Sequence, residues 1–167
     1  MKLDVAARIG VHQKTWALGC LAVVFSLEWV DRSLLVIALE PIKADLQLSD
    51  QQLGVVAAMQ AWAAVFAVLP IARLADTRNR RDIVAVALLV WALGTTLSGC
   101  FATYEGLLVA RAVVGLGTAG FRPVALALLT DFFPPEERGR AFGIFALGWQ
   151  SGNLFGYIGG GWLSHGP

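Results

Sequence analysis

The chain has little charge, little cysteine and little histidine, and each shortage excludes a class of protein. Only 15% of its 167 residues are charged and the formal net charge is +1, which gives no support for a nucleic-acid partner. The two cysteines, Cys20 and Cys100, both lie inside apolar segments, where we expect buried, inert thiols and no disulfide. The two histidines, His12 and His165, lie near opposite ends of the chain and belong to no metal or nucleophile motif. The sequence therefore predicts no enzyme, no cofactor and no metal site.

Apolar residues are abundant and occur in long runs. They make up 57% of the chain, and the mean hydropathy is +0.65. A hydrocarbon core of about 30 Å takes about 20 helical residues to cross. Residues 53–72 form one such run, and residues 83–103 form another that contains no charged side chain. The link between them is short and rich in arginine, which is typical of a hairpin in a multi-pass membrane protein.

Five transmembrane helices can be drawn, so the predicted fold is an all-α membrane bundle. Helices are expected because lipid leaves no water to satisfy backbone groups, and no barrel-like alternation is present. Pro134 and Pro135 end the fourth span, whereas Pro70 and Pro123 fall within spans, where neighbouring helices can satisfy the freed carbonyls. We predict a segment 1–15, a bundle 16–163 and an end 164–167, with spans at about 16–39, 52–73, 83–101, 106–133 and 141–163.

Basic residues predict the orientation of this bundle. Nine of the 13 lysines and arginines fall in the N-terminal segment and in the second and fourth links, whereas only Lys43 lies on the other side. Because lysine and arginine collect in cytoplasmic loops, we expect a cytoplasmic N-terminus. The chain stops after an odd number of spans, so we expect it to be the N-terminal part of a longer protein rather than a natural five-span chain.

The first span carries ionisable residues that are costly inside a bilayer. Glu28, Asp31 and Arg32 are spaced i, i+3 and i+4 and therefore share one helix face. Such residues persist where they line a cavity or pair with one another, and they mark substrate or proton pathways. The alternatives are a static ion pair between helices or, for Glu28, a hydrogen bond to a neighbouring helix.

The fourth span presents a second polar face, made of Arg111, Thr118 and Arg122. Eleven residues separate the two arginines, so their directions differ by only about 20° around the helix. Asp31 lies about 12 Å below the outer end of its span and Arg111 about 8 Å below its own, at about 1.5 Å per residue. We therefore predict that the two faces meet in a shared polar cavity; the alternative for Arg111 is that it snorkels to the interface.

Glycine recurs every four residues along the fifth span. Such a stripe of small residues allows close helix approach, so it predicts helix packing before any direct function. The four residues of the stripe are Gly148, Gly152, Gly156 and Gly160.

Several motifs, in the same order, resemble those of the major facilitator superfamily of transporters. The loop from Leu74-Ala75-Asp76 to Arg80-Arg81 resembles the signature between the second and third helices, although Ala72 and Thr77 replace a usual glycine and arginine. Arg111-x-x-x-Gly115-x-Gly117-x-Ala119 resembles the fourth-helix signature, and the segment 131–141 resembles the link that follows it. The fifth-helix glycines fit the pattern of exchangers, except that Tyr157 replaces its proline. The resemblance implies the N-terminal part of a twelve-helix bundle.

Within the superfamily the chain looks most like bacterial spinster-like carriers. Asp31-Arg32 in the first helix and the segments 69–76 and 79–81 carry this resemblance, and the similar anion:cation symporters share the Asp-Arg pair. Both groups commonly have a glutamate where this chain has Thr118. The departure leaves Asp31 as the leading protonation site, with Glu28 as its substitute.

The resemblance implies a secondary active transporter in a bacterial inner membrane. We expect proton-coupled, alternating-access transport of a small organic anion or lysolipid-like amphipath, completed by a missing C-terminal half and surrounded by membrane lipid. Arg32 and Arg111 would attract an anionic group, while Asp76, Arg80 and Arg81 would form a gating loop, unless that loop is only a solvated determinant of topology. The alternative function is a non-transporting binding or structural remnant of such a transporter.

Overall fold

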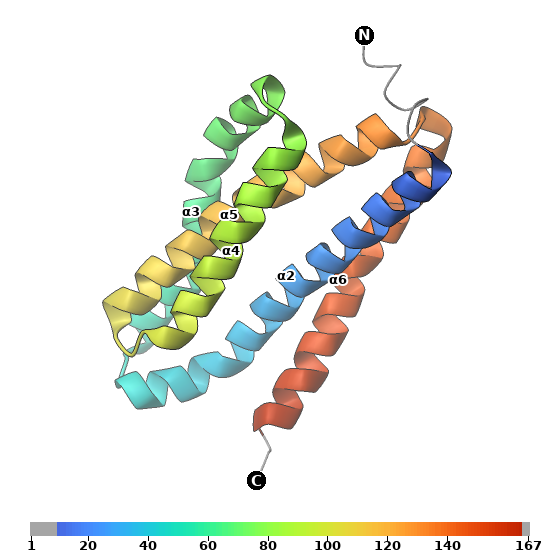
Figure 1. Cartoon of the computed structure of the whole chain (residues 1–167). Helices are drawn as coiled ribbons and strands as arrows, with labels where there is room; N and C mark the ends of the chain where they lie inside the picture. The colour runs from blue at the N-terminus through green and yellow to red at the C-terminus, as the bar shows by residue number, and fades with distance from the viewer. Residues whose placement is uncertain (1–9, 165–167) are drawn as a thin grey trace. The chain divides into compact units, whose positions relative to one another are not determined.

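The computed structural model describes residues 10–164 as an all-helical chain (Figure 1), which confirms the predicted fold class. Residues 1–9 and 165–167 lie outside the described part of the chain, so the predictions that concern them, His165 included, have no structural outcome. The helices are α2 Val11–Leu46, α3 Asp50–Thr77, α4 Arg80–Cys100, α5 Tyr104–Phe132 and α6 Pro135–Ser164.

Every helix begins earlier than the predicted span, and α2, α3 and α6 also end later. The reason is local chemistry at the ends. Ser49 caps α3, and Gln52 completes a capping box with it. Asn79 caps α4 by accepting a hydrogen bond from the Arg81 backbone N–H at 3.2 Å. Pro135 is the first residue of α6, where its missing N–H costs nothing.

The turn between α2 and α3 depends on Gln47, which has a φ of 51° and lies in the left-handed region. The N–H of Leu48 donates to the carbonyl of Lys43 at 3.0 Å, which closes the end of α2. Beyond it, Lys43 forms an ion pair with Asp50 at the start of α3. The hydrogen bond and negative charge of Asp50 raise the pKa of Lys43.

Three helices among the described residues are long and apolar enough to cross a membrane, namely α3, α4 and α5. The helices α2 and α6 have 36 and 30 residues, so they are long enough to cross a membrane, and they differ from α3, α4 and α5 in being less apolar. Acidic and basic side chains interrupt α2 at Glu28, Asp31 and Arg32, and glycine and polar residues dilute α6.

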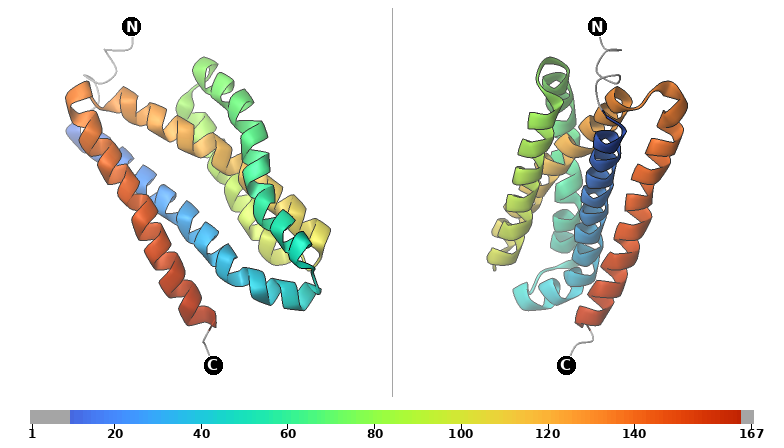
Figure 2. Two further views of the ribbon diagram at one scale, coloured as in Figure 1. Left: turned by 180° about the vertical axis from the view of Figure 1, so that it is seen from behind. Right: turned by 45° about the vertical axis from the view of Figure 1, so that its right-hand side comes forward.

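The chain divides into two compact units, Met1–Ile37 with Ala125–Pro167 and Ala38–Val124. In the first unit α2 and α6 lie side by side (Figures 1 and 2). In the second unit α3 and α4 both pack against α5 at glycines. A Cβ atom added at Gly115 would lie 2.8 Å from the Cβ of Ala63 on α3, and one added at Gly117 would lie 2.5 Å from the backbone nitrogen of Trp91 on α4.

Cys20 and Cys100 are both free, and both are exposed on the surface of the chain. The prediction that they are buried is therefore wrong. Each lies on a helix face that no other described segment covers, and sequence hydropathy does not distinguish such a face from a packed one.

Candidate functional site

The acidic residues predicted in the first span lie on α2, within the first unit. Glu28 is buried, with only 4% of its surface exposed, and Asp31 and Arg32 are half-buried. Burial of a carboxylate in an otherwise apolar helix is costly, which is why such residues usually have a functional or pairing role.

Arg32 lies above the ring of Trp29, with its guanidinium carbon 5.1 Å from the ring centroid. This geometry is a cation–π interaction, which favours a cation in a poorly hydrated place. Trp29 in turn contacts Trp149 of α6, with ring centroids 5.6 Å apart. One turn earlier, Phe25 of α2 stacks on Phe145 of α6 at 4.5 Å.

The sequence-based predictions did not include these aromatic residues, although the sequence contains a signal for them. Phe25 and Trp29 are four residues apart on α2, and Phe145 and Trp149 repeat that spacing on α6. Residues spaced by four share a helix face, so two matching pairs indicate one aromatic seam. Trp29 of this seam is the residue over which Arg32 lies.

Two hydroxyl contacts also join α2 to α6. Ser33, which is 2% exposed, donates a hydrogen bond from its Oγ to Oδ1 of Asn153 at 3.1 Å. The Oγ atoms of Ser151 and Ser26 lie 3.1 Å apart and form a second bond. Interhelical hydrogen bonds of this kind hold membrane helices in one register.

The α6 glycine stripe faces α2. A Cβ atom added at Gly148 would lie 2.6 Å from the backbone carbonyl oxygen of Ala22, and one at Gly152 would overlap that of Ser26. Side chains of α2 occupy the space beside Gly156 and Gly160. In contrast, nothing lies within 4 Å of a Cβ atom added at Gly159. The α2–α6 contact therefore needs glycine at particular positions of α6.

The second polar face lies on α5, within the second unit. Arg111 is 6% exposed, and Thr118 and Arg122 are half-buried. The hydroxyl of Thr118 donates to the carbonyl of Gly115 in its own helix at 3.1 Å. The two polar faces thus belong to different compact units, and the predicted meeting of Asp31 with Arg111 stays a prediction.

The predicted gating loop is shorter in the structure than the sequence suggested. Asp76 belongs to the last turn of α3, and Arg80 and Arg81 form the first turn of α4, so only Arg78 and Asn79 lie between the helices. Asp76 and Arg81 are exposed and Arg80 is half-buried. The residue that caps α4 is Asn79, which the sequence analysis did not single out.

Comparison with known proteins agrees with this architecture. The family model of the Major Facilitator Superfamily matches residues 21–167. The chain is 34% identical over 163 residues to an MFS-type efflux pump of Mycolicibacterium smegmatis, covering 96% of this chain and 38% of the relative. It is 33% identical over 153 residues to the puromycin resistance protein pur8 of Streptomyces alboniger, covering 91% of this chain and 30% of the relative. The chain thus spans about a third of the length of these relatives.

A solved structure shares the fold. It is the crystal structure of a bacterial homologue of the human lysosomal transporter Spinster, in an inward-facing and unoccupied conformation. The similarity has a TM-score of 0.79 at 29% identity and covers 92% of this chain and 36% of that one. A family match over most of the sequence and a shared fold lead to one conclusion: the chain is not an enzyme but a multi-pass membrane protein, and it belongs to the Major Facilitator Superfamily.

Proposed function

We propose that the protein is a proton-coupled secondary transporter of a small organic anion or a lysolipid-like amphipath, working by alternating access in a bacterial inner membrane. The observation that carries the proposal is the group on α2, where buried Glu28 precedes half-buried Asp31 and Arg32 within one long helix. Membership of a transporter family and the spinster-like neighbour support it. Carboxyl groups at membrane depth in transporters commonly act in proton relays.

Asp31 is the protonation site in this proposal, and Glu28 is its substitute. When Asp31 takes up a proton it loses its negative charge, so its attraction for a nearby arginine disappears. Such a change alters the relative free energies of two conformations that place those charges differently. In the family picture, two related halves rock around a central site, and this change would favour one of the two access states.

Arg32 and Arg111 supply positive charge for the anionic group of the substrate, with Thr118 and Arg122 on the same face as Arg111. Arg32 lies over Trp29, which leaves the edge of its guanidinium to donate hydrogen bonds to a carboxylate or phosphate. An aromatic ring beside a cation suits an amphipathic anion, because the ring contacts the apolar part while the cation binds the charge. Asp76, Arg80 and Arg81 would act at the cytoplasmic gate.

The decisive experiment uses the Asp31→Asn variant of the intact protein in sealed vesicles. Uptake of a panel of organic anions and lysolipids is measured with and without an imposed pH gradient. Asp31→Asn should abolish the gradient-dependent uptake and leave protein abundance unchanged. Asp45→Asn is a matched control, because it makes the same chemical change at an exposed position of α2 beyond the predicted span.

Undiminished gradient-driven uptake in Asp31→Asn would refute the role of that residue. Binding of a panel compound without any uptake, in vesicles that contain the whole gene product, would favour the alternative of a non-transporting remnant. A coding region that stops directly after Pro167 would point the same way.

A further inference from the structure

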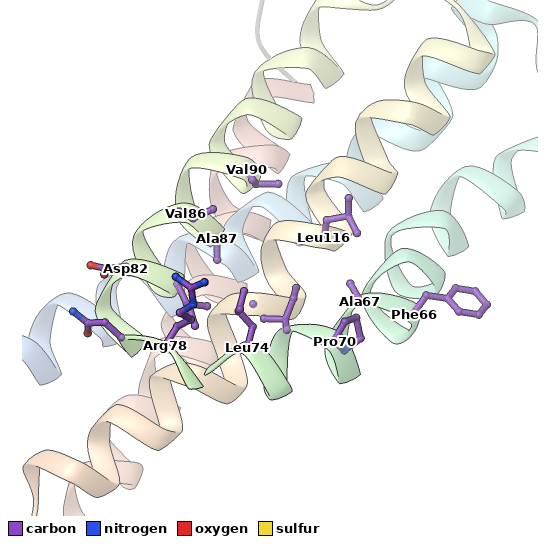
Figure 3. A pocket seen from close by; sticks show the side chains of 14 residues that line it. Phe66, Ala67, Pro70, Leu74, Arg78, Asp82, Val86, Ala87, Val90 and Leu116 are labelled. Carbon is purple, nitrogen blue, oxygen red and sulfur yellow. The ribbon is translucent and has the colours of Figure 1, made fainter. Parts of the chain in front are cut away.

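An open apolar groove lies between α3, α4 and α5 of the second unit (Figure 3). Its volume is about 900 Å³. The long walls consist of aliphatic and aromatic side chains, and the end next to the α3–α4 link contains the polar residues. The lining residues that matter to the argument are Phe66, Leu74, Val86, Val90, Leu116 and Arg78.

The length of this groove matches one leaflet of a bilayer. Val90 lies eight residues beyond Asp82 on α4, a rise of about 12 Å, and Phe66 of α3 lies twelve residues before Arg78, which directly follows that helix, a rise of about 18 Å. Half of a 30 Å hydrocarbon core is about 15 Å. Both helices are long and apolar enough to span a membrane, and the link joins them at a membrane surface. The groove therefore begins near headgroup depth and continues to about the middle of the bilayer.

The end at headgroup depth is positively charged. Arg73, Arg78, Arg80 and Arg81 stand against Asp76 and Asp82, an excess of two positive charges in ten residues. Arg78 is exposed, and within the described residues no hydrogen bond or ion pair to its side chain is found. Arg78 and Leu74 both line the groove, and in Figure 3 the carboxylate of Asp82 points away from the labelled apolar side chains.

The α4 N-terminus adds to this positive charge. The capped end of α4 starts directly after Arg78, and the backbone dipoles of a helix place a partial positive charge at that end. These features match the parts of a phospholipid. The cation and the helix N-terminus suit its phosphate, and the adjoining apolar channel of one-leaflet length suits an acyl chain. Basic pockets between transmembrane helices on the cytoplasmic side are known to bind anionic headgroups.

We propose that this groove is a binding site for an anionic phospholipid of the surrounding membrane. The phosphate binds Arg78 at the start of α4, and one acyl chain lies along the wall formed by Leu74, Val86, Val90 and Leu116. An apolar helix would cover the same wall, but it would leave the guanidinium of Arg78 without an anion. Charge complementarity therefore favours the lipid.

The chemistry also predicts which lipids the groove distinguishes. Lipid tails around the protein are as apolar as the wall, so the acyl chain does not make the groove prefer one lipid over another. The headgroup makes the difference, because an arginine donates charge-assisted hydrogen bonds to a phosphate. A zwitterionic lipid also has a phosphate, but its choline cation would lie beside the surplus arginines of residues 73–82, so the site should prefer lipids with a net negative charge.

The test measures lipid retention by the intact protein in detergent, by native mass spectrometry during titration. The probes are dioleoylphosphatidylglycerol, which is anionic, and dioleoylphosphatidylcholine, which is zwitterionic. The Arg78→Gln variant lacks one arginine at the groove, so its affinity for the anionic lipid should fall by about fivefold to tenfold, whereas its affinity for the zwitterionic lipid, whose choline offsets the phosphate charge, should fall by less. Arg73→Gln is the matched control, since Arg73 is also exposed but does not line the groove.

A second pair of variants tests the acyl-chain wall. Val86→Trp fills the groove from an exposed position and should lower retention of both lipids, whereas Leu89→Trp, which is also exposed on α4 but does not line the groove, should not. Equal losses in Arg78→Gln and Arg73→Gln, or unchanged retention in Val86→Trp, would overturn the proposal. Tight binding of free glycerol 3-phosphate would also overturn it, because the acyl chain would then be irrelevant.

A separate outcome identifies the competing occupant. If cross-linking from Val86 captures another segment of the same protein in place of lipid, the groove is a helix-packing surface and the proposal fails. The proposal does not depend on transport. Lipid selectivity should be normal in Asp31→Asn, so loss of proton-driven uptake and loss of lipid binding are distinguishable results.

Discussion

Replacing Gly152 by alanine should weaken the contact between α2 and α6. The added methyl group would overlap the backbone carbonyl oxygen of Ser26 and lie 2.7 Å from the Cβ of Trp29. A backbone oxygen within a helix cannot rotate aside as the end of a side chain can. The two helices must therefore move apart, and the Ser33–Asn153 hydrogen bond, one residue further along α6, must lengthen with them.

The expected magnitude is the difference between two opposing effects. Alanine in place of glycine stabilises a helix interior by about 1 kcal/mol. Overfilling a packed contact costs about 1–3 kcal/mol, and the cost lies at the upper end here because the obstacle is backbone. We expect Gly152→Ala to lower the free energy of unfolding by about 1–2 kcal/mol, as the sum of these two effects.

Gly159→Ala is the control, because nothing lies within 4 Å of a Cβ atom added there. This variant should retain the gain in helix propensity and be neutral or more stable by up to about 1 kcal/mol. Gly148→Ala should behave like Gly152→Ala, since its methyl group would lie 2.6 Å from the Ala22 carbonyl oxygen.

Stability is measured on the intact protein in detergent micelles. Far-ultraviolet circular dichroism follows the helices during denaturation by sodium dodecyl sulfate, and tryptophan fluorescence follows the Trp29–Trp149 contact, whose ring centroids lie 5.6 Å apart. Gly152→Ala should shift both transitions to lower detergent fractions. Equal stability of Gly152→Ala and Gly159→Ala would refute the steric reasoning and the α2–α6 register behind it.

Three further predictions concern single contacts. In a double-mutant cycle, Ser33→Ala and Asn153→Leu should couple by about 0.5–1 kcal/mol, and additive losses would contradict their hydrogen bond. Ser49→Ala should lower the unfolding free energy by about 1 kcal/mol through loss of the α3 cap, whereas Ser49→Asp should retain most of it. The pKa of Lys43 is raised above its ordinary value of 10.5 by Asp50, so this ion pair stabilises the fold below that value and the contribution disappears as pH rises through the raised pKa. Lys43→Gln should therefore differ from the native protein at neutral pH and converge with it in strongly alkaline solution, and a constant difference across that range would be inconsistent with the ion pair.

Helix number and type followed from composition, because membrane-length apolar runs have only one way to satisfy their backbone groups. The exact ends were harder to predict. The apolar run predicts that α4 begins near residue 83, whereas the helix begins at Arg80, because Asn79 caps it by accepting a hydrogen bond from the Arg81 backbone N–H. A capping residue such as Asn79 is visible in the sequence, but the sequence does not show which of its asparagines and serines cap a helix.

The candidate site was also only partly predictable from the sequence. The spacing of Glu28, Asp31 and Arg32 placed them on one face of a helix, and that inference needs only helix geometry. Which side chains surround them was beyond the sequence. Trp29, over which Arg32 lies, also contacts Trp149 of α6, and these two tryptophans are 120 residues apart in the sequence.

The sequence by itself therefore determined the membrane class, the five helices, the family and the positions of the charged residues along each helix. Tertiary structure alone decided which glycines of α6 face α2, which serine binds Asn153, and where the apolar groove beside Arg78 opens. The physical reason lies in the solvent. Lipid is as apolar as the side chains that face it, so polarity does not determine how a membrane helix is rotated about its axis. That rotation is fixed by the close packing of small residues and by a few interhelical hydrogen bonds, both of which exist only once the helices have met.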